Sequence, residues 1–141
     1  MVIISVDLGK ARTGLAICDK TGFLASPLET IFEYNEEKLI DKICVTAKEN
    51  KAELIVVGLP KNMDGSEGES AKNARAFAQK LSEKSGIKTT MQDERGTTIT
   101  AHNYLSEQDV RGKKRKKAVD TVAASIILQN YLDSLKGENN G

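Results

Sequence analysis

Residues 2–18 read VIISVDLGKARTGLAIC and decide how the predicted sheet begins. Val2 to Val6 is β-branched and almost entirely apolar, which is typical of a strand buried on both faces, and Asp7 ends it. Gly14 to Cys18 is a second short apolar strand, and after a turn Phe23 to Ser26 forms a third. This stretch therefore predicts a meander of strands at the start of the chain.

Beyond the meander, strand patterns alternate with helix patterns. Continuous apolar runs predict strands at Glu53 to Gly58 and at Ile87 to Gln92. Apolar residues at helical spacing predict helices from the N-cap Asn35 to about Asn50, from about Ala71 to Gly86, over 97–105, and from Val119 to about Tyr131. A meander followed by alternating units predicts an α/β fold, with a mixed sheet and helices packed on its faces.

The length and composition indicate one ordinary globular domain. A chain of 141 residues falls in the usual size range of a single domain, and 39% hydrophobic with 29% charged residues excludes a disordered or fibrous chain. We expect a single domain over residues 1–136 and a flexible polar tail over residues 137–141.

The formal net charge of +1 hides a strongly basic run. Residues 111–117 read RGKKRKK, so six of the 21 lysines and arginines lie there, and the other 15 face 20 aspartates and glutamates. We expect these cations to form a loop directly before the predicted final helix, where they could bind the phosphates of a nucleic acid. The ordinary alternative is a loop of solvated charges. With only three Phe and three Tyr in the chain, extensive base stacking is not expected.

The cysteines and the first residues indicate the compartment. Cys18 and Cys44 fall in apolar patterns without the spacing of metal ligands, so we expect two small buried side chains and no oxidising compartment. The apolar run at the amino terminus is too short to span a membrane and has no basic leader. We expect a cytoplasmic protein without a membrane partner. The only histidine, His102, is expected to be structural or on the surface.

Acids stand where two strands end and where a helix should pack. Asp7 closes the first strand, Asp93 and Glu94 close the last one, and Asp120 lies early in the final helix beside its apolar face. A cluster of carboxylates repels itself at neutral pH unless a divalent cation such as Mg²⁺ or Mn²⁺ lies between them. Each acid also has an ordinary role, as a loop cap or as a partner of the helix dipole. The pattern indicates a metal site only if the three positions meet in space.

The polar loop from Asp7 to Gly14 joins the first two strands. Its two glycines let the backbone approach a phosphate, and Lys10 and Arg12 add positive charge. The loop is not a Walker A motif, which requires a lysine after its second glycine where this chain has Leu15. A tight turn between strands is the alternative.

Four ordered blocks of residues span nearly the whole chain. They are Asp7-Leu8-Gly9 with Arg12, Gly14 and Ala16; Val56-Val57-Gly58-Leu59-Pro60; Asp93-Glu94-Arg95 with Thr97-Thr98; and Asp120 with Ala123 and Ala124 before Ile127-Leu128. In these blocks the sequence resembles the YqgF family, also called RuvX, of Holliday-junction-resolvase-like proteins with a ribonuclease H-like fold. The resemblance implies a five-stranded mixed sheet flanked by helices on both faces and nuclease chemistry with a divalent metal. It also implies a part in maturing the 5′ end of pre-16S ribosomal RNA during ribosome biogenesis in bacteria.

Carried over by position, the family's catalytic and metal-binding acids fall on Asp7, Glu94 and Asp120. Whether Asp93 or Glu94 points inward depends on the strand register, since a shift of one residue exchanges the two faces. The sequence departs from the family at Gly96, where a larger apolar residue is usual. The residues expected to contact nucleic acid are Gly9, Lys10, Arg12, Lys61, Arg95, Lys113, Lys114, Arg115, Lys116 and Lys117.

Our leading interpretation is a metal-dependent nuclease that hydrolyses phosphodiester bonds in structured nucleic acid, with precursor ribosomal RNA as substrate and Mg²⁺ or Mn²⁺ as cofactor. A resolvase of four-way DNA junctions is the alternative with the same chemistry, and it favours a homodimer over a monomer because two strands are cut together. A non-catalytic RNA-binding factor of ribosome assembly is another. An ATPase of the actin and sugar-kinase type binds nucleotide between two related domains, and 141 residues supply only one.

Overall fold

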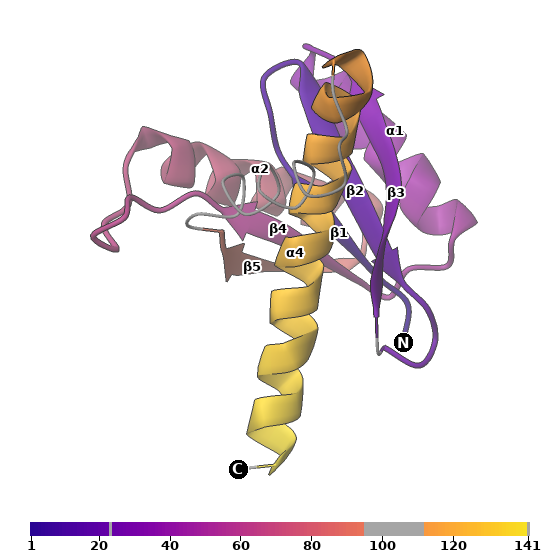
Figure 1. Cartoon of the computed structure of the whole chain (residues 1–141). Helices are drawn as coiled ribbons and strands as arrows, with labels where there is room; N and C mark the ends of the chain where they lie inside the picture. The colour runs from indigo at the N-terminus through magenta and orange to yellow at the C-terminus, as the bar shows by residue number, and fades with distance from the viewer. Residues whose placement is uncertain (23, 95–111, 141) are drawn as a thin grey trace.

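The computed structural model describes residues 1–22, 24–94 and 112–140, with only the backbone of 112–118 and 136–140. Its five strands form one sheet in the order β3-β2-β1-β4-β5 (Figure 1). The pairs β1–β2 and β2–β3 are antiparallel, whereas β1–β4 and β4–β5 are parallel, so the predicted five-stranded mixed sheet is confirmed. The strands are β1 (Ile3–Asp7), β2 (Arg12–Cys18), β3 (Ala25–Phe32), β4 (Leu54–Leu59) and β5 (Lys88–Asp93).

Helices cover both faces of this sheet, as expected. Because side chains alternate along a strand, Ile4 and Val6 of β1 pack against α1 (Glu36–Glu49) and α2 (Glu69–Ser85). Ile3 points the other way and packs against α4 (Gly112–Asn140), which crosses the opposite face (Figure 1). Cys18 and Cys44 are buried free thiols, one in each of these two layers. No helix in the described ranges is long and apolar enough to span a membrane.

The ends of α1 and α2 follow from local sequence. The side chain of Asn35 accepts a hydrogen bond from the backbone N–H of Lys38 at 2.9 Å, so Asn35 is the N-cap of α1, as predicted. Gly86 ends α2 with φ +71°, a left-handed conformation that favours glycine over residues with a side chain. Both helices therefore begin or end within about two residues of the predicted positions.

The third strand differs from its prediction. A strand was expected over residues 23–26, whereas β3 covers Ala25–Phe32 and Phe23 lies outside the described residues. Pro27 interrupts the strand pattern but is tolerated because β3 is the edge strand of the sheet. The pairing of β2 with β3 also shifts between Leu15 and Ala16, which adds one residue to β3 and breaks its alternation.

The final helix is longer than its apolar spacing predicted. It begins at Gly112, so Lys113 to Lys117 are helical and the expectation of a basic loop is wrong. Lysine and arginine are good helix formers, so the run extends the helix instead of preceding it. Asp120 consequently lies more than two turns from the start of α4 and does not complement its dipole. At the other end α4 reaches Asn140, beyond the start of the tail expected over 137–141. The helix expected over 97–105 lies outside the described residues.

Candidate active site

The acids singled out in the sequence come from three elements and gather at one end of the sheet. Asp7 is the last residue of β1, Glu94 directly follows β5, and Asp120 lies on α4. Since β1 and β5 both run parallel to β4, their carboxyl ends share one edge. The carboxyl groups of Asp7 and Glu94 are hydrogen-bonded to each other, and the charge of Asp120 acts on Asp7. The fold thus brings together three acids that are far apart in the sequence.

The register of β5 decides which acid of the neighbouring pair points to this cluster. Asp93 pairs with Leu59, whose side chain packs on the α2 side of the sheet. Successive residues of a strand face opposite ways, so Glu94 is directed to the α4 side. A Cβ atom at Gly58 would lie 2.6 Å from Oε2 of Glu94 and 2.7 Å from Cδ1 of Ile127 on α4. The absent side chain at Gly58 therefore provides the space that Glu94 occupies.

Asp120 is held against the sheet by close contacts between backbones. A Cβ atom at Gly14 of β2 would overlap the carbonyl oxygen of Asp120, so only glycine permits this approach of α4. One turn further along, the buried hydroxyl of Ser5 donates a 2.6 Å hydrogen bond to the carbonyl oxygen of Ala124. These contacts tie α4 to β1 and β2 and fix the height of Asp120 over the sheet.

The side chain of Asp120 is incompletely satisfied. Its Oδ2 atom is buried and accepts no hydrogen bond within the described part of the chain. The closest described cation is Arg12, whose Nε lies 3.5 Å from that oxygen. This distance makes an ion pair without a hydrogen bond of normal geometry. The oxygen is therefore available to another electrophilic partner.

Burial shifts the pKa of all three carboxyl groups upward. It raises the pKa of Asp7 to about 6, although the hydrogen bond from Glu94 lowers it and the charge of Asp120 adds to the rise. Burial, the charge of Asp7 and the hydrogen bond to Asp7 raise the pKa of Glu94 to about 9. Burial also raises the pKa of Asp120, partly offset by the Arg12 guanidinium. At neutral pH Glu94 therefore keeps its proton, and its O–H donates a hydrogen bond to the carboxylate of Asp7.

These side chains fit a divalent cation by donor type and by charge. Carboxylate oxygens are the ligands that Mg²⁺ and Mn²⁺ prefer, and Oδ2 of Asp120, which accepts no hydrogen bond from the described residues, could accept a cation beside Arg12. The raised pKa values of Asp7 and Glu94 show that negative charge on these buried groups needs compensation. A proton compensates it in the metal-free site, and a cation could do the same. Within the described ranges, however, no three histidine, cysteine, aspartate or glutamate side chains are arranged to hold a metal ion as they stand.

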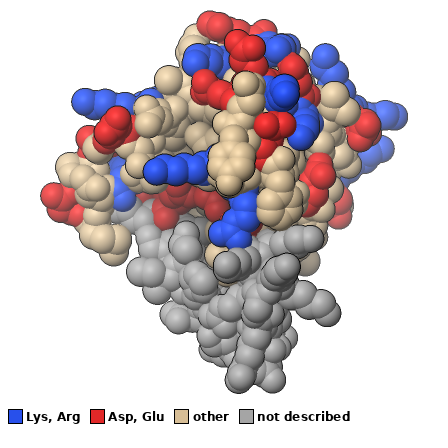
Figure 2. All heavy atoms as spheres, turned by 90° about the horizontal axis from the view of Figure 1, so that it is seen from above, with Lys and Arg blue, Asp and Glu red and all other residues tan. Residues whose placement is uncertain are grey.

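The expected nucleic-acid contacts divide into those near the acids and those elsewhere. Gly9 and Lys10 lie in the loop between β1 and β2 that follows Asp7, and Arg12 begins β2 and pairs with Asp120. Lys61 lies in the loop between β4 and α2, and Arg95 and His102 fall outside the described residues. The backbone of Lys113, Lys114, Arg115, Lys116 and Lys117 forms the start of α4. Figure 2 looks onto this end of the molecule and shows acidic atoms in a hollow with basic side chains at its rim.

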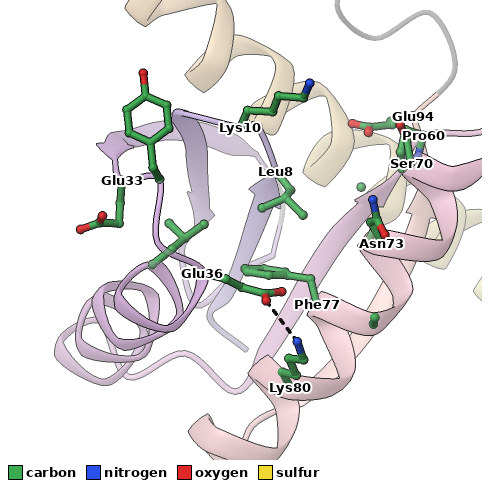
Figure 3. Close-up of a pocket in the computed structure, with 16 residues that line it drawn as sticks. Leu8, Lys10, Glu33, Glu36, Pro60, Ser70, Asn73, Phe77, Lys80 and Glu94 are labelled. Atoms are coloured by element: carbon green, nitrogen blue, oxygen red, sulfur yellow. Dashed lines mark hydrogen bonds and ion pairs between the residues drawn. The ribbon is translucent and has the colours of Figure 1, made fainter.

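A cleft of about 700 Å³ opens beside Glu94, and no sequence pattern predicted it. Figure 3 shows Asn73 and Phe77 of α2 on one side of this cleft and Leu8 and Lys10 of the β1–β2 loop on the other. An exposed asparagine on a helix carries no signal of its own in a sequence, since such residues are common on solvated faces. Only the packing of α2 beside the β1–β2 loop makes Asn73 part of a cleft.

A mixed sheet in this strand order, with carboxylates at the ends of β1 and β5 and on a helix across them, defines a ribonuclease H-like protein. The RuvX family, described as Holliday junction resolvase, matches residues 1–134, and the chain belongs to that family. The resemblance noted in the sequence is therefore confirmed.

Relatives with high identity cover nearly the whole chain. A protein of Clostridium botulinum (strain Alaska E43 / Type E3), described as "Putative pre-16S rRNA nuclease", is 44% identical over 135 residues, which are 96% of this chain and 98% of the relative. A protein of Lactococcus lactis subsp. cremoris (strain MG1363) with the same description is 43% identical over 134 residues, 94% of each chain.

Solved structures of resolvases share the fold. RuvC of T. thermophilus in complex with a Holliday junction substrate superposes with a TM-score of 0.61 at 12% identity and covers 97% of this chain and 96% of its own. The Fowlpox virus resolvase in complex with Holliday junction DNA gives 0.55 at 14% identity, over 96% of this chain and 99% of its own. At these identities the likeness concerns the fold alone.

Proposed function

We propose that this chain is a metal-dependent nuclease that hydrolyses phosphodiester bonds in structured RNA, and that its substrate is the 5′ end of pre-16S ribosomal RNA. The observation that carries the proposal is the meeting of Asp7, Glu94 and Asp120 at one end of the sheet, beside Arg12. The substrate follows from the description shared by relatives at 43 to 44% identity over nearly the whole chain. We also propose that the protein acts in the cytoplasm, where bacteria process this RNA.

The three acids have distinct parts in this proposal. Asp7, Glu94 and Asp120 would hold Mg²⁺ or Mn²⁺, and a divalent ion bound among carboxylates supplies activation of water and stabilisation of charge on the phosphate. Glu94 would hold the cation as a carboxylate, because a cation and a proton compensate the same buried negative charge. Asp120 would hold the cation through Oδ2, which accepts no hydrogen bond within the described part of the chain and lies 3.5 Å from Nε of Arg12.

The basic side chains position the substrate. Arg12 lies 3.5 Å from Asp120 and is 38% exposed, so its guanidinium can pair with a phosphate oxygen while remaining next to the acids. Lys10 is exposed and lines the same cleft as Glu94. These contacts would recognise the backbone and fix its place at the site, and they would not distinguish one base from another.

Four-way DNA junctions are the second candidate substrate, favoured by the family description and by the shared fold with junction-bound RuvC. Cutting two strands symmetrically favours a homodimer, whereas RNA processing requires only a monomer. Both substrates demand the same chemistry at the three acids.

A comparison of substrates tests the proposal. Purified protein and its Asp7→Asn variant are incubated with precursor 16S rRNA and with four-way junction DNA, each in Mg²⁺, Mn²⁺ or chelator. We expect metal-dependent cutting of the RNA at its 5′ end by the wild type alone. Cutting of the junction and not the RNA would favour the resolvase. RNA binding with no cutting by either protein would indicate a non-catalytic assembly factor.

A further inference from the structure

We propose that the cleft beside Glu94 is a subsite for an unpaired nucleotide that adjoins the phosphate to be cut. This inference rests on the proposed nuclease function and names the local form of nucleic acid that the site accepts. The cleft shares Gly58, Pro60 and Glu94 with the end of the sheet where the acids meet. From there it runs between α2 and the β1–β2 loop toward the start of α1 (Figure 3). A nucleic-acid strand whose phosphate lies at the three acids would therefore place its neighbouring nucleotide in the cleft.

The lining of the cleft is apolar at its base. Leu8, Leu39, Ala74 and Phe77 line it; Leu39, Ala74 and Phe77 are only 1 to 3% exposed, so Leu8, which is half-buried, is the one of the four with appreciable accessible surface. A phosphate loses hydration without compensation on such a surface, whereas a planar base gains from burying its face there. The volume of about 700 Å³ lies within the range of sites that hold small organic ligands. The base of the cleft therefore suits a nucleobase better than a sugar-phosphate backbone.

Neutral polar groups stand along the α2 side. Ser70 and Asn73 are exposed and line the cleft, and Figure 3 shows both on α2 between Glu94 and Phe77. Because the Asn73 side chain is exposed in the cleft, its amide can donate to and accept from a ligand there. An amide and a hydroxyl together offer both donors and acceptors, as the edge of a base requires.

An exposed aromatic ring lies at the far end of the cleft. Tyr34 lines it and is 84% exposed, the most exposed of the large hydrophobic side chains in the described ranges. A ring without cover beside a nucleotide-sized cleft offers a stacking surface for the next base. The acids at this end carry partners already, Glu36 with Lys80 at 3.1 Å and Glu33 with Lys42 at 3.0 Å. They therefore oppose a nucleic acid less than free carboxylates would.

Only an unpaired nucleotide can use these features. In a double helix the faces of the bases are stacked and their Watson–Crick edges are paired, so neither is open to Leu8, Asn73 or Tyr34. A segment that is single-stranded next to the cleavage position presents both. The predicted preference is for an unpaired flank, with Lys10 on its backbone at the rim of the cleft.

Binding of two RNA probes in chelator tests the subsite without cleavage. The probes are a short fluorescein-labelled single-stranded RNA and the same RNA annealed to its complement. Tyr34→Ala and Asn73→Ala are each expected to weaken binding of the single strand about tenfold and to leave the duplex unchanged. The matched controls are Phe32→Ala, an exposed aromatic outside the cleft, and Gln79→Ala, an exposed amide elsewhere on α2, both expected to bind as the wild type does.

The outcomes separate this subsite from the nuclease function. Wild-type affinity of Tyr34→Ala and Asn73→Ala for the single strand, or an equal loss for single strand and duplex, would overturn the subsite. If the protein cuts no RNA in Mg²⁺ but the two variants lose single-strand binding selectively, the subsite stands and the nuclease function fails. If the protein cuts RNA and the variants match their controls, the nuclease function stands and the subsite fails.

Discussion

Glu94 donates a hydrogen bond to Asp7 across β4, the strand that separates β5 from β1 in the sheet. The contact exists because Gly58 of β4 has no side chain to fill the space beneath Glu94. Two carboxyl groups so close and so buried cannot both ionise without a compensating cation. The pair therefore links the protonation of the site to its occupation by metal and to the stability of the fold.

Glu94→Gln is expected to stabilise the metal-free protein at about pH 8, by about 2 kcal/mol in the free energy of unfolding. The folded-state pKa of Glu94, about 9, lies above its ordinary 4.5, so the wild type is most stable below the ordinary pKa and loses stability as the pH rises toward 9. Gln cannot ionise and avoids this loss. Thermal melts in chelator at about pH 5 and pH 8 measure the difference, which should be small at the lower pH.

Glu53→Gln is the matched control, because Glu53 is exposed and lies far from the acids at the other end of β4. It should shift the melting temperature equally at both pH values. If the wild type and Glu94→Gln had the same pH dependence of stability, Glu94 would not hold the proton that bonds it to Asp7.

Arg12→Gln is expected to lower the free energy of unfolding by less than about 1 kcal/mol at neutral pH, since the guanidinium is partly exposed and its pairing with Asp120 is screened by water. The effect should shrink in an Asp120→Asn background, where the buried oxygen carries no charge. Urea unfolding of the two single variants and the double variant measures this coupling. Strictly additive changes would mean that the 3.5 Å contact carries no energy. Lys20→Gln, at an exposed position, serves as the control for loss of a positive charge.

Gly58→Ala is expected to destabilise the fold by about 2 kcal/mol and to displace Glu94, because the added Cβ would lie 2.6 Å from its Oε2 and 2.7 Å from Cδ1 of Ile127. The nearest atom to a Cβ at Gly68 is 3.7 Å away, so Gly68→Ala is the control and should cost less than about 1 kcal/mol. Chemical unfolding and the rate of RNA cleavage check both effects. Equal stability and equal cleavage rates for the two variants would contradict the role assigned to Gly58.

Much of the fold could be predicted from local patterns, that is, from residues close together in the sequence. The continuous apolar runs of β1 and β4 and the caps Asn35 and Gly86 mark elements whose interactions are local or repeat regularly. The edge strand β3 escaped prediction beyond Ser26 because Pro27 and a shift in pairing disturb its alternation. The start of α4 escaped because its first two turns are basic and have no apolar spacing.

The site was predictable as a set of residues and not as an arrangement. Strand ends and the helix face pointed to Asp7, the pair Asp93–Glu94 and Asp120, and the resemblance to a family chose Glu94 of the pair. Which acid of the pair faces the other two depends on the register of β5 with β4. The requirement for glycine at Gly14 and Gly58 depends on how close α4 and Glu94 approach, which no local pattern encodes. The cleft beside Glu94 depends likewise on the packing of α2 against a loop far away in the sequence.

The most direct test of the proposed function is the rate at which the protein and its Asp7→Asn variant cut the 5′ end of precursor 16S rRNA in Mg²⁺, with both proteins at saturating concentration. Asp7 interacts with both other acids: it is hydrogen-bonded to Glu94, and the charge of Asp120 raises its pKa. We expect cutting at one position by the wild type, and for Asp7→Asn a rate no higher than that without protein, although the variant melts cooperatively and still binds the RNA. Cutting by Asp7→Asn at the wild-type rate would contradict the assignment of the active site to these three acids.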